Sequence, residues 1–116
     1  MRDSAPSAVP GAGASRNEVT ALDTRHIRAA VALAEHRSFT RAAKALFVAQ
    51  STLSRQVAAL ERSLGRELFV RGQGKVELTV YGAAFLPHAR QVLASVRAAE
   101  EAVRSAAGDA VRPAAS

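Results

Sequence analysis

The chain of 116 residues is long enough for one small domain, and its formal net charge is +6. Hydrophobic residues make up 48% of it but aromatic residues only 4%, so the core must be built from Ala, Val and Leu, which favours closely packed helices. The absence of cysteine excludes disulfides and thiolate metal sites, and it fits a cytoplasmic location. No apolar run approaches the roughly 18–20 residues of a membrane span. The residues after Arg2 contain no apolar h-region, so we expect no secretory signal.

The positive charge is confined to the middle of the chain. Residues 23–90 hold eleven Lys and Arg against five Asp and Glu, whereas the flanking segments are balanced. A basic folded region between neutral tails points to a polyanionic partner, most often nucleic acid. Charge alone leaves open a basic surface that has no such partner.

The first 21 residues are rich in Ala, Ser, Pro and Gly without an apolar period, which predicts a disordered tail. A helix capped by Asp23 or Thr24 is then expected to run to about His36. One face of it should be a buried stripe, because apolar residues recur at i, i+3, i+4 and i+7. That stripe consists of Ile27, Ala30, Val31 and Ala34.

Two more helices, joined by a tight turn, are predicted between residues 37 and 65. The first is short, with Ser38 as its cap, and the second runs from about Gln50 to Leu64 and ends at Gly65. Their inward residues are Phe39, Ala42, Ala43 and Leu46 in the first helix and Leu53, Val57, Leu60 and Leu64 in the second. This is the pattern of a helix-turn-helix, which places its second helix in the DNA major groove.

Residues 66–78 predict a small β-hairpin, or wing. Two short β-prone runs flank the turn Gly72-Gln73-Gly74, with Arg71 and Lys75 near the tip. Thr79 then caps a helix that is expected to reach about Ala106, which leaves residues 107–116 as a flexible tail.

The last helix carries apolar residues at alternating spacings of four and three, which form a heptad seam. The seam residues are Phe85, Ala89, Val92, Val96, Ala99 and Val103. A helix this long cannot bury the whole seam on so small a domain, so we expect it to pair with a second copy of the chain. Packing of the seam on the chain's own domain is the alternative.

In this order of elements, the segments SFTRAAKAL, QSTLSRQVAALERSLGRELFVR and LTVYGAAFLPHARQVL resemble the N-terminal DNA-binding domain of LysR-type transcriptional regulators, over roughly residues 22–99. The resemblance implies a mainly α fold. Three helices and a short β-hairpin would form a winged helix-turn-helix at residues 22–78, and a dimerisation linker helix would follow at residues 79–106. It also implies binding to double-stranded DNA as a homodimer, at an inverted-repeat operator.

In that family the start of the long helix reads bases, and the wing reaches the minor groove or the DNA backbone. The corresponding base-reading positions are Gln50, Ser51, Thr52, Ser54 and Arg55, and the wing positions are Arg71 and Lys75. The chemistry agrees, because Gln can pair with adenine and Arg with guanine. Ser38, Thr40 and Arg41 sit at a helix start, where hydroxyls, free amides and charge suit a phosphate. Taken singly, a residue of each of these types is more often an ordinary polar surface residue than a DNA contact.

The chain departs from the family pattern at several positions. Ala49 replaces a capping Ser, which costs about 1 kcal/mol of helix stability, and Ser51 replaces a common Pro. Gly74 stands where the wing often carries Arg, and Val80 replaces an acidic residue of a capping box. Family members also carry a C-terminal α/β effector-binding domain, for which no strand and helix pattern follows here, so we expect no small-molecule ligand in these residues.

The sequence gives no sign of an enzyme. His26, His36 and His88 lack metal-ligand spacing, and no nucleophile elbow or Gly-rich phosphate loop is present, so neither a metal nor a cofactor is expected. The favoured function is that of a sequence-specific transcription-regulator module. The alternatives are a nonspecific architectural DNA-binding protein driven by charge and a protein-interaction module that uses the seam.

Overall fold

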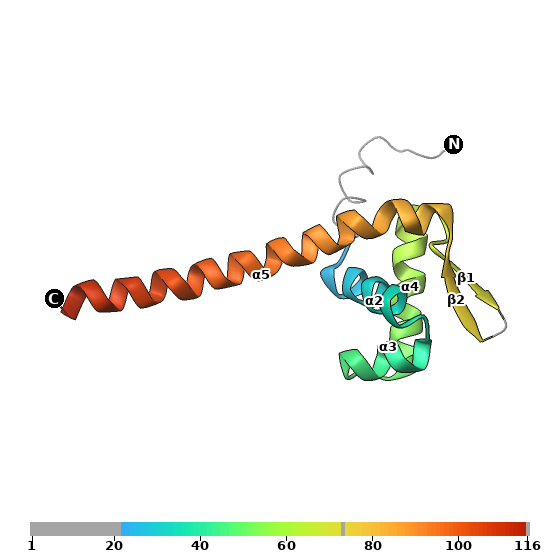
Figure 1. Cartoon of the computed structure of the whole chain (residues 1–116), viewed down its shortest axis with the longest axis horizontal. Coiled ribbons are helices and arrows are strands. Elements are labelled where there is room, and N and C mark those ends of the chain that lie inside the picture. The colour runs from blue at the N-terminus through green and yellow to red at the C-terminus, as the bar shows by residue number, and fades with distance from the viewer. Residues whose placement is uncertain (1–21, 73, 116) are drawn as a thin grey trace, which may run out of the picture.

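The computed structural model describes residues 22–72 and 74–115 of the chain. Its elements are the helices α2 (Thr24–His36), α3 (Phe39–Leu46) and α4 (Gln50–Leu64), the strands β1 (Phe69–Gly72) and β2 (Lys75–Leu78), and the helix α5 (Val80–Ala115). The predicted fold, a mainly α winged helix-turn-helix followed by a long helix, is confirmed (Figure 1). The tail predicted at residues 1–21 lies outside the described residues.

The first two helices begin at polar side chains that accept hydrogen bonds from the free backbone amides. The Asp23 carboxylate accepts from the backbone N–H of Arg25 at 2.8 Å, and the Ser38 hydroxyl accepts from that of Arg41 at 3.1 Å. Asp23, rather than Thr24, is therefore the cap of α2. Hydrogen bonds from the Arg25 side chain and backbone lower the pKa of Asp23 to about 2.

Helix α2 lies in the middle of the domain, with α3, α4 and the first part of α5 packed around it (Figure 1). The single stripe predicted for it is therefore too narrow. Ala29, Ala32 and Leu33 are buried as well as the predicted Ile27, Ala30 and Val31, whereas Ala34 is only half-buried. The rest of the core is formed by Ala42, Ala43, Leu53, Val57, Leu60, Leu68, Phe69, Val76, Leu86, Ala89 and Leu93.

The antiparallel hairpin of β1 and β2 is closed at its base by Thr79. The Thr79 N–H donates to the Leu68 carbonyl at 2.9 Å, and its hydroxyl donates to the Glu67 carbonyl at 2.6 Å. The same hydroxyl accepts from the N–H of Gly82 at 3.1 Å, so Thr79 caps α5 as predicted. Gly82 lies so close to β1 that a Cβ there would overlap the Leu68 carbonyl oxygen.

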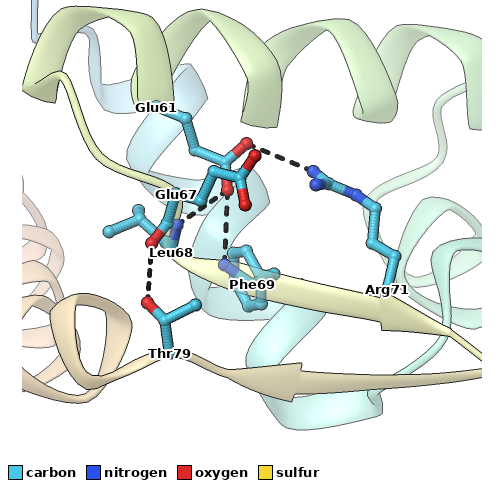
Figure 2. Close-up of polar contacts among 6 residues, drawn as sticks. All are labelled: Glu61, Glu67, Leu68, Phe69, Arg71 and Thr79. Atoms are coloured by element: carbon cyan, nitrogen blue, oxygen red, sulfur yellow. Dashed lines mark hydrogen bonds and ion pairs between the residues drawn. The ribbon is translucent and has the colours of Figure 1, made fainter.

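A buried carboxylate, that of Glu61, joins α4 to the wing (Figure 2). Its Oε2 accepts from the backbone N–H groups of Leu68 at 2.8 Å and Phe69 at 3.3 Å, and its Oε1 is 3.2 Å from Nη2 of Arg71. Only 8% of Glu61 is exposed, so these three donors replace the water that the carboxylate loses on folding. The start of the wing is thereby tied to the helix that precedes it.

Helix α5 projects far beyond the domain (Figure 1). We expected it to end near Ala106 and to leave a flexible tail at residues 107–116, but it continues to Ala115. Alanine, the strongest helix former, recurs in this segment and favours the extension, although Gly108 and Pro113 both oppose it.

The predicted seam of α5 is not one continuous surface. Ala89 is buried in the chain's own core and Phe85 packs against it, because the first turns of α5 lie on the domain. Leu86 and Leu93, which the heptad pattern omitted, are buried beside Ala89. The chain's own core therefore buries Ala89 and part of Phe85, two positions that the prediction included in the seam for a partner. The remaining four, Val92, Val96, Ala99 and Val103, are exposed or half-buried.

No helix within the described part of the chain is both long and apolar enough to cross a membrane.

Gly82→Ala tests the close contact between α5 and β1. Although Ala favours helices, its methyl group must displace the Leu68 backbone, so we expect the free energy of unfolding in urea to fall by about 1–3 kcal/mol. Gly72→Ala is the matched control, because a Cβ there has no atom within 4 Å. Equal stability of the two variants would contradict the close approach.

Glu61→Ala tests the junction between α4 and the wing. It leaves two backbone N–H groups and the Arg71 guanidinium without their buried acceptor, so we expect a loss of about 2–3 kcal/mol in the free energy of unfolding. Glu67→Ala removes an exposed carboxylate nearby and should change stability by less than about 0.5 kcal/mol. A change of less than about 0.5 kcal/mol for Glu61→Ala as well would show that the junction is energetically unimportant.

Candidate nucleic-acid interface

A surface groove runs between the start of α3, the start of α4 and the wing. It brings together residues from all three groups predicted to contact DNA, although they are up to 37 positions apart in the sequence, from Ser38 to Lys75. The groove is lined by Ser38, Phe39, Thr40, Gln50, Arg71, Gly72, Gly74, Lys75 and Val76. We call this surface the wing groove.

At the start of α3, the hydroxyls of Ser38 and Thr40 make different hydrogen bonds. The Ser38 oxygen accepts from the Arg41 N–H as the cap of the helix, whereas the Thr40 hydroxyl donates to Oε1 of Gln50 at 2.9 Å. The predicted phosphate-contacting group is thus linked directly to the first base-reading residue. The Arg41 side chain is exposed.

The first turns of α4 present the predicted base-reading face to solvent. Ser51, Ser54 and Arg55 are exposed and Thr52 is half-buried, while Leu53 on the opposite side is completely buried. Nη2 of Arg55 lies 3.4 Å from the Thr52 hydroxyl, a long contact that leaves the guanidinium free to move.

The missing cap of α4 is confirmed, because Ala49 makes no side-chain hydrogen bond to the first turn. The free backbone N–H groups of that turn remain oriented outward along the helix axis, where the helix dipole favours negative charge.

The two cations of the wing have different surroundings. The register pairs Arg71 with the buried Val76 and Lys75 with Gly72, so alternation places them on opposite faces of the hairpin. Arg71 turns back toward the domain and contacts Glu61 (Figure 2). Its guanidinium also lies 5.5 Å from the centre of the Phe39 ring. Lys75 is exposed. The sequence pattern places both Arg71 and Lys75 near the tip and does not distinguish their surroundings.

Glu61 is the residue whose role sequence reasoning missed. Its signal was present, because it follows Leu53 by eight positions and Val57 by four, which places a charged residue on the buried face of α4. A carboxylate there requires buried donors, and the sequence does not reveal that the backbone of β1 supplies them.

Within residues 22–72 and 74–115, no group of three or more His, Cys, Asp or Glu is arranged to hold a metal ion.

Both the sequence and the fold of the chain resemble those of known proteins. Residues 24–83 match the model of the bacterial regulatory helix-turn-helix proteins of the lysR family. The HTH-type transcriptional regulator ShiR of Corynebacterium glutamicum is 44% identical over 90 residues, which are 78% of this chain and 30% of ShiR. The chain spans between 25% and 30% of the length of ShiR and of four other curated relatives.

Two solved structures share the fold at the level of single domains. The BenM_DBD/catB site 1 DNA complex is 38% identical with a TM-score of 0.71, and the match covers 74% of this chain and 97% of that one. The CbnR_DBD–DNA complex is 37% identical with a TM-score of 0.69, and the match covers 74% of this chain and 99% of that one. The curated relatives are transcriptional regulators rather than enzymes, which agrees with the expectation for this chain. The chain belongs to the lysR family of bacterial regulatory helix-turn-helix proteins, and it contains that family's winged helix-turn-helix domain.

Proposed function

We propose that the chain binds double-stranded DNA sequence-specifically as a homodimer, as the DNA-binding module of a LysR-type transcriptional regulator in the bacterial cytoplasm. The observation that carries this proposal is the wing groove, where the start of α3, the start of α4 and the wing converge. The BenM_DBD and CbnR_DBD structures, which share this fold, are titled as complexes with DNA.

Burial supports a direct role for α4 in base recognition. Its inner face is fixed in the core by Leu53, Val57 and Leu60, so the polar face is held outward on a rigid element. The convex, exposed start of a helix fits the major groove, where each base pair presents a distinct set of donors and acceptors. Gln50, Ser51, Thr52, Ser54 and Arg55 are the proposed base-reading residues.

The phosphates are assigned to the elements beside α4. Ser38, Thr40 and Arg41 lie at the start of α3, and Lys75 extends from the outer face of the wing. Arg71 would contribute only partly to the contact between the wing and DNA. Its side chain is 40% exposed, and its guanidinium already contacts Glu61. Lys75 therefore supplies most of the charge of the wing.

The proposed dimer uses the part of α5 that leaves the domain. Val92, Val96 and Ala99 line a shallow groove along this helix, and Val103 continues it with 70% of its surface exposed. A second copy of α5 would bury these side chains, and two-fold symmetry would then require an inverted-repeat DNA site.

Selection from a pool of random duplexes tests the function directly. We expect an inverted repeat whose half-sites are separated by about one helical turn or a multiple of it. Recovery of duplexes without a common motif, together with affinity that falls steeply with salt, would instead indicate a nonspecific architectural DNA-binding protein.

Arg55→Ala and Lys75→Ala separate base reading from phosphate binding. Loss of a base-reading Arg should reduce discrimination at one base pair by about 1–3 kcal/mol. Loss of a phosphate contact should weaken all sequences alike and lower the slope of log affinity against log salt by about 1. Binding isotherms on the selected and on scrambled duplexes measure both effects. Equal losses on both duplexes for both variants would contradict this division.

Val96→Asp tests the dimer. A carboxylate in the middle of the apolar groove should convert the protein to monomers in light scattering and greatly reduce affinity for paired half-sites. Ala98→Asp introduces the same charge two residues away, on an exposed position outside that groove, and should leave the dimer intact. A Val96→Asp protein that remains dimeric would place the interface elsewhere.

A further inference from the structure

The hydrogen bond between Thr40 and Gln50 lies inside the wing groove and connects two helices. The Thr40 Oγ1 is 2.9 Å from Oε1 of Gln50, ten residues later in the chain. An amide oxygen can only accept a hydrogen bond, so the Thr40 hydroxyl is the donor and Oε1 of Gln50 is the acceptor. Both residues are exposed, so their free polar groups can reach a ligand in the groove.

This contact changes which hydrogen bonds Gln50 can offer to a base. A Gln that reads adenine with both ends accepts from adenine N6 through its oxygen and donates to adenine N7 through its nitrogen. The Thr40 hydroxyl takes one of the two lone pairs of that oxygen and fixes the direction of the amide, so adenine N6 is left with only the other lone pair. The Nε2 donor of Gln50 stays free, and it suits the acceptors that guanine and thymine present in the major groove, O6 and N7 or O4.

Thr40 is well placed to hold Gln50 still. It lies in the first turn of α3, which is capped by Ser38 and fixed to the core through the buried Ala42 and Ala43. Gln50 is the first residue of α4, whose start has no side-chain cap. A long amide side chain at that position would otherwise lose rotamer freedom on binding DNA, so a fixed neighbour lowers the entropic cost of recognition.

We propose that Thr40 is a specificity-determining residue that acts through Gln50. By taking one lone pair of Oε1 and fixing the amide, it disfavours adenine and favours guanine or thymine at the base pair that Gln50 reads. This inference rests on the proposed function, because it presupposes that α4 reads bases.

The test is random-duplex selection with the full chain and three variants of Thr40 and Gln50. Gln50→Ala identifies the base pair that Gln50 reads, as the position whose preference disappears. The wild type should select guanine or thymine there. Thr40→Val keeps the shape of the side chain but removes the hydroxyl, so the ratio of affinities for adenine over guanine should rise on the order of tenfold at that position alone. In the Gln50→Ala background, Thr40→Val should leave base preference unchanged.

Two further variants control the result. Thr40→Ser keeps the donor and should restore the wild-type preference. Thr24→Val makes the same chemical change at an exposed position of α2, outside the wing groove, and should leave the selected motif unchanged.

Either of two outcomes would overturn the proposal. If Thr40→Val weakens all sequences equally and its effect adds to that of Gln50→Ala, Thr40 contacts only a phosphate. If the wild type itself selects no motif, the proposed sequence-specific function also fails, and this outcome is recognised without any variant.

Discussion

The buried carboxylate of Glu61 makes the contacts on which the geometry of the wing groove, the proposed DNA-binding surface, depends. It accepts hydrogen bonds from two backbone amides at the start of β1 and from Arg71, so α4 and the wing are held in one orientation. Arg71 in turn covers the ring of Phe39 at the start of α3. One ion-paired cluster therefore links all three elements that line the wing groove. A buried charge of this kind contributes more through the orientation it imposes than through net stability.

The base of the wing is held by hydrogen bonds of Thr79 and by the close approach of α5. Thr79 fastens the base of the hairpin to the first turn of α5, and Gly82 allows that turn to approach the Leu68 carbonyl. Because α5 also carries the proposed dimer surface, the same contacts would set the angle between the wing grooves of the two copies in the dimer. In the proposed dimer, the separation of two half-sites on DNA would depend on residues that need not touch DNA.

The sequence predicts the helices of the domain because their apolar spacings and caps are local. Ser38, Gly65 and Thr79 mark element ends through short-range hydrogen bonds, and the structure places each of them as expected. Non-local packing was harder to foresee. The heptad pattern of α5 does not distinguish a partner from the chain's own core, so Ala89 was assigned to the wrong surface. The contacts of Glu61 with β1 and of Thr40 with Gln50 cross between elements, and spacing alone does not reveal them.

The assignment of the wing groove to DNA is tested most directly by an NMR titration of the backbone amides with a duplex that carries the selected motif. We expect the largest shifts at residues 38–41 and 50–55 and at Lys75, and small shifts around Arg25 and Arg28, which are exposed on α2. Shifts concentrated on α2, with the start of α3, the start of α4 and the wing unaffected, would contradict it.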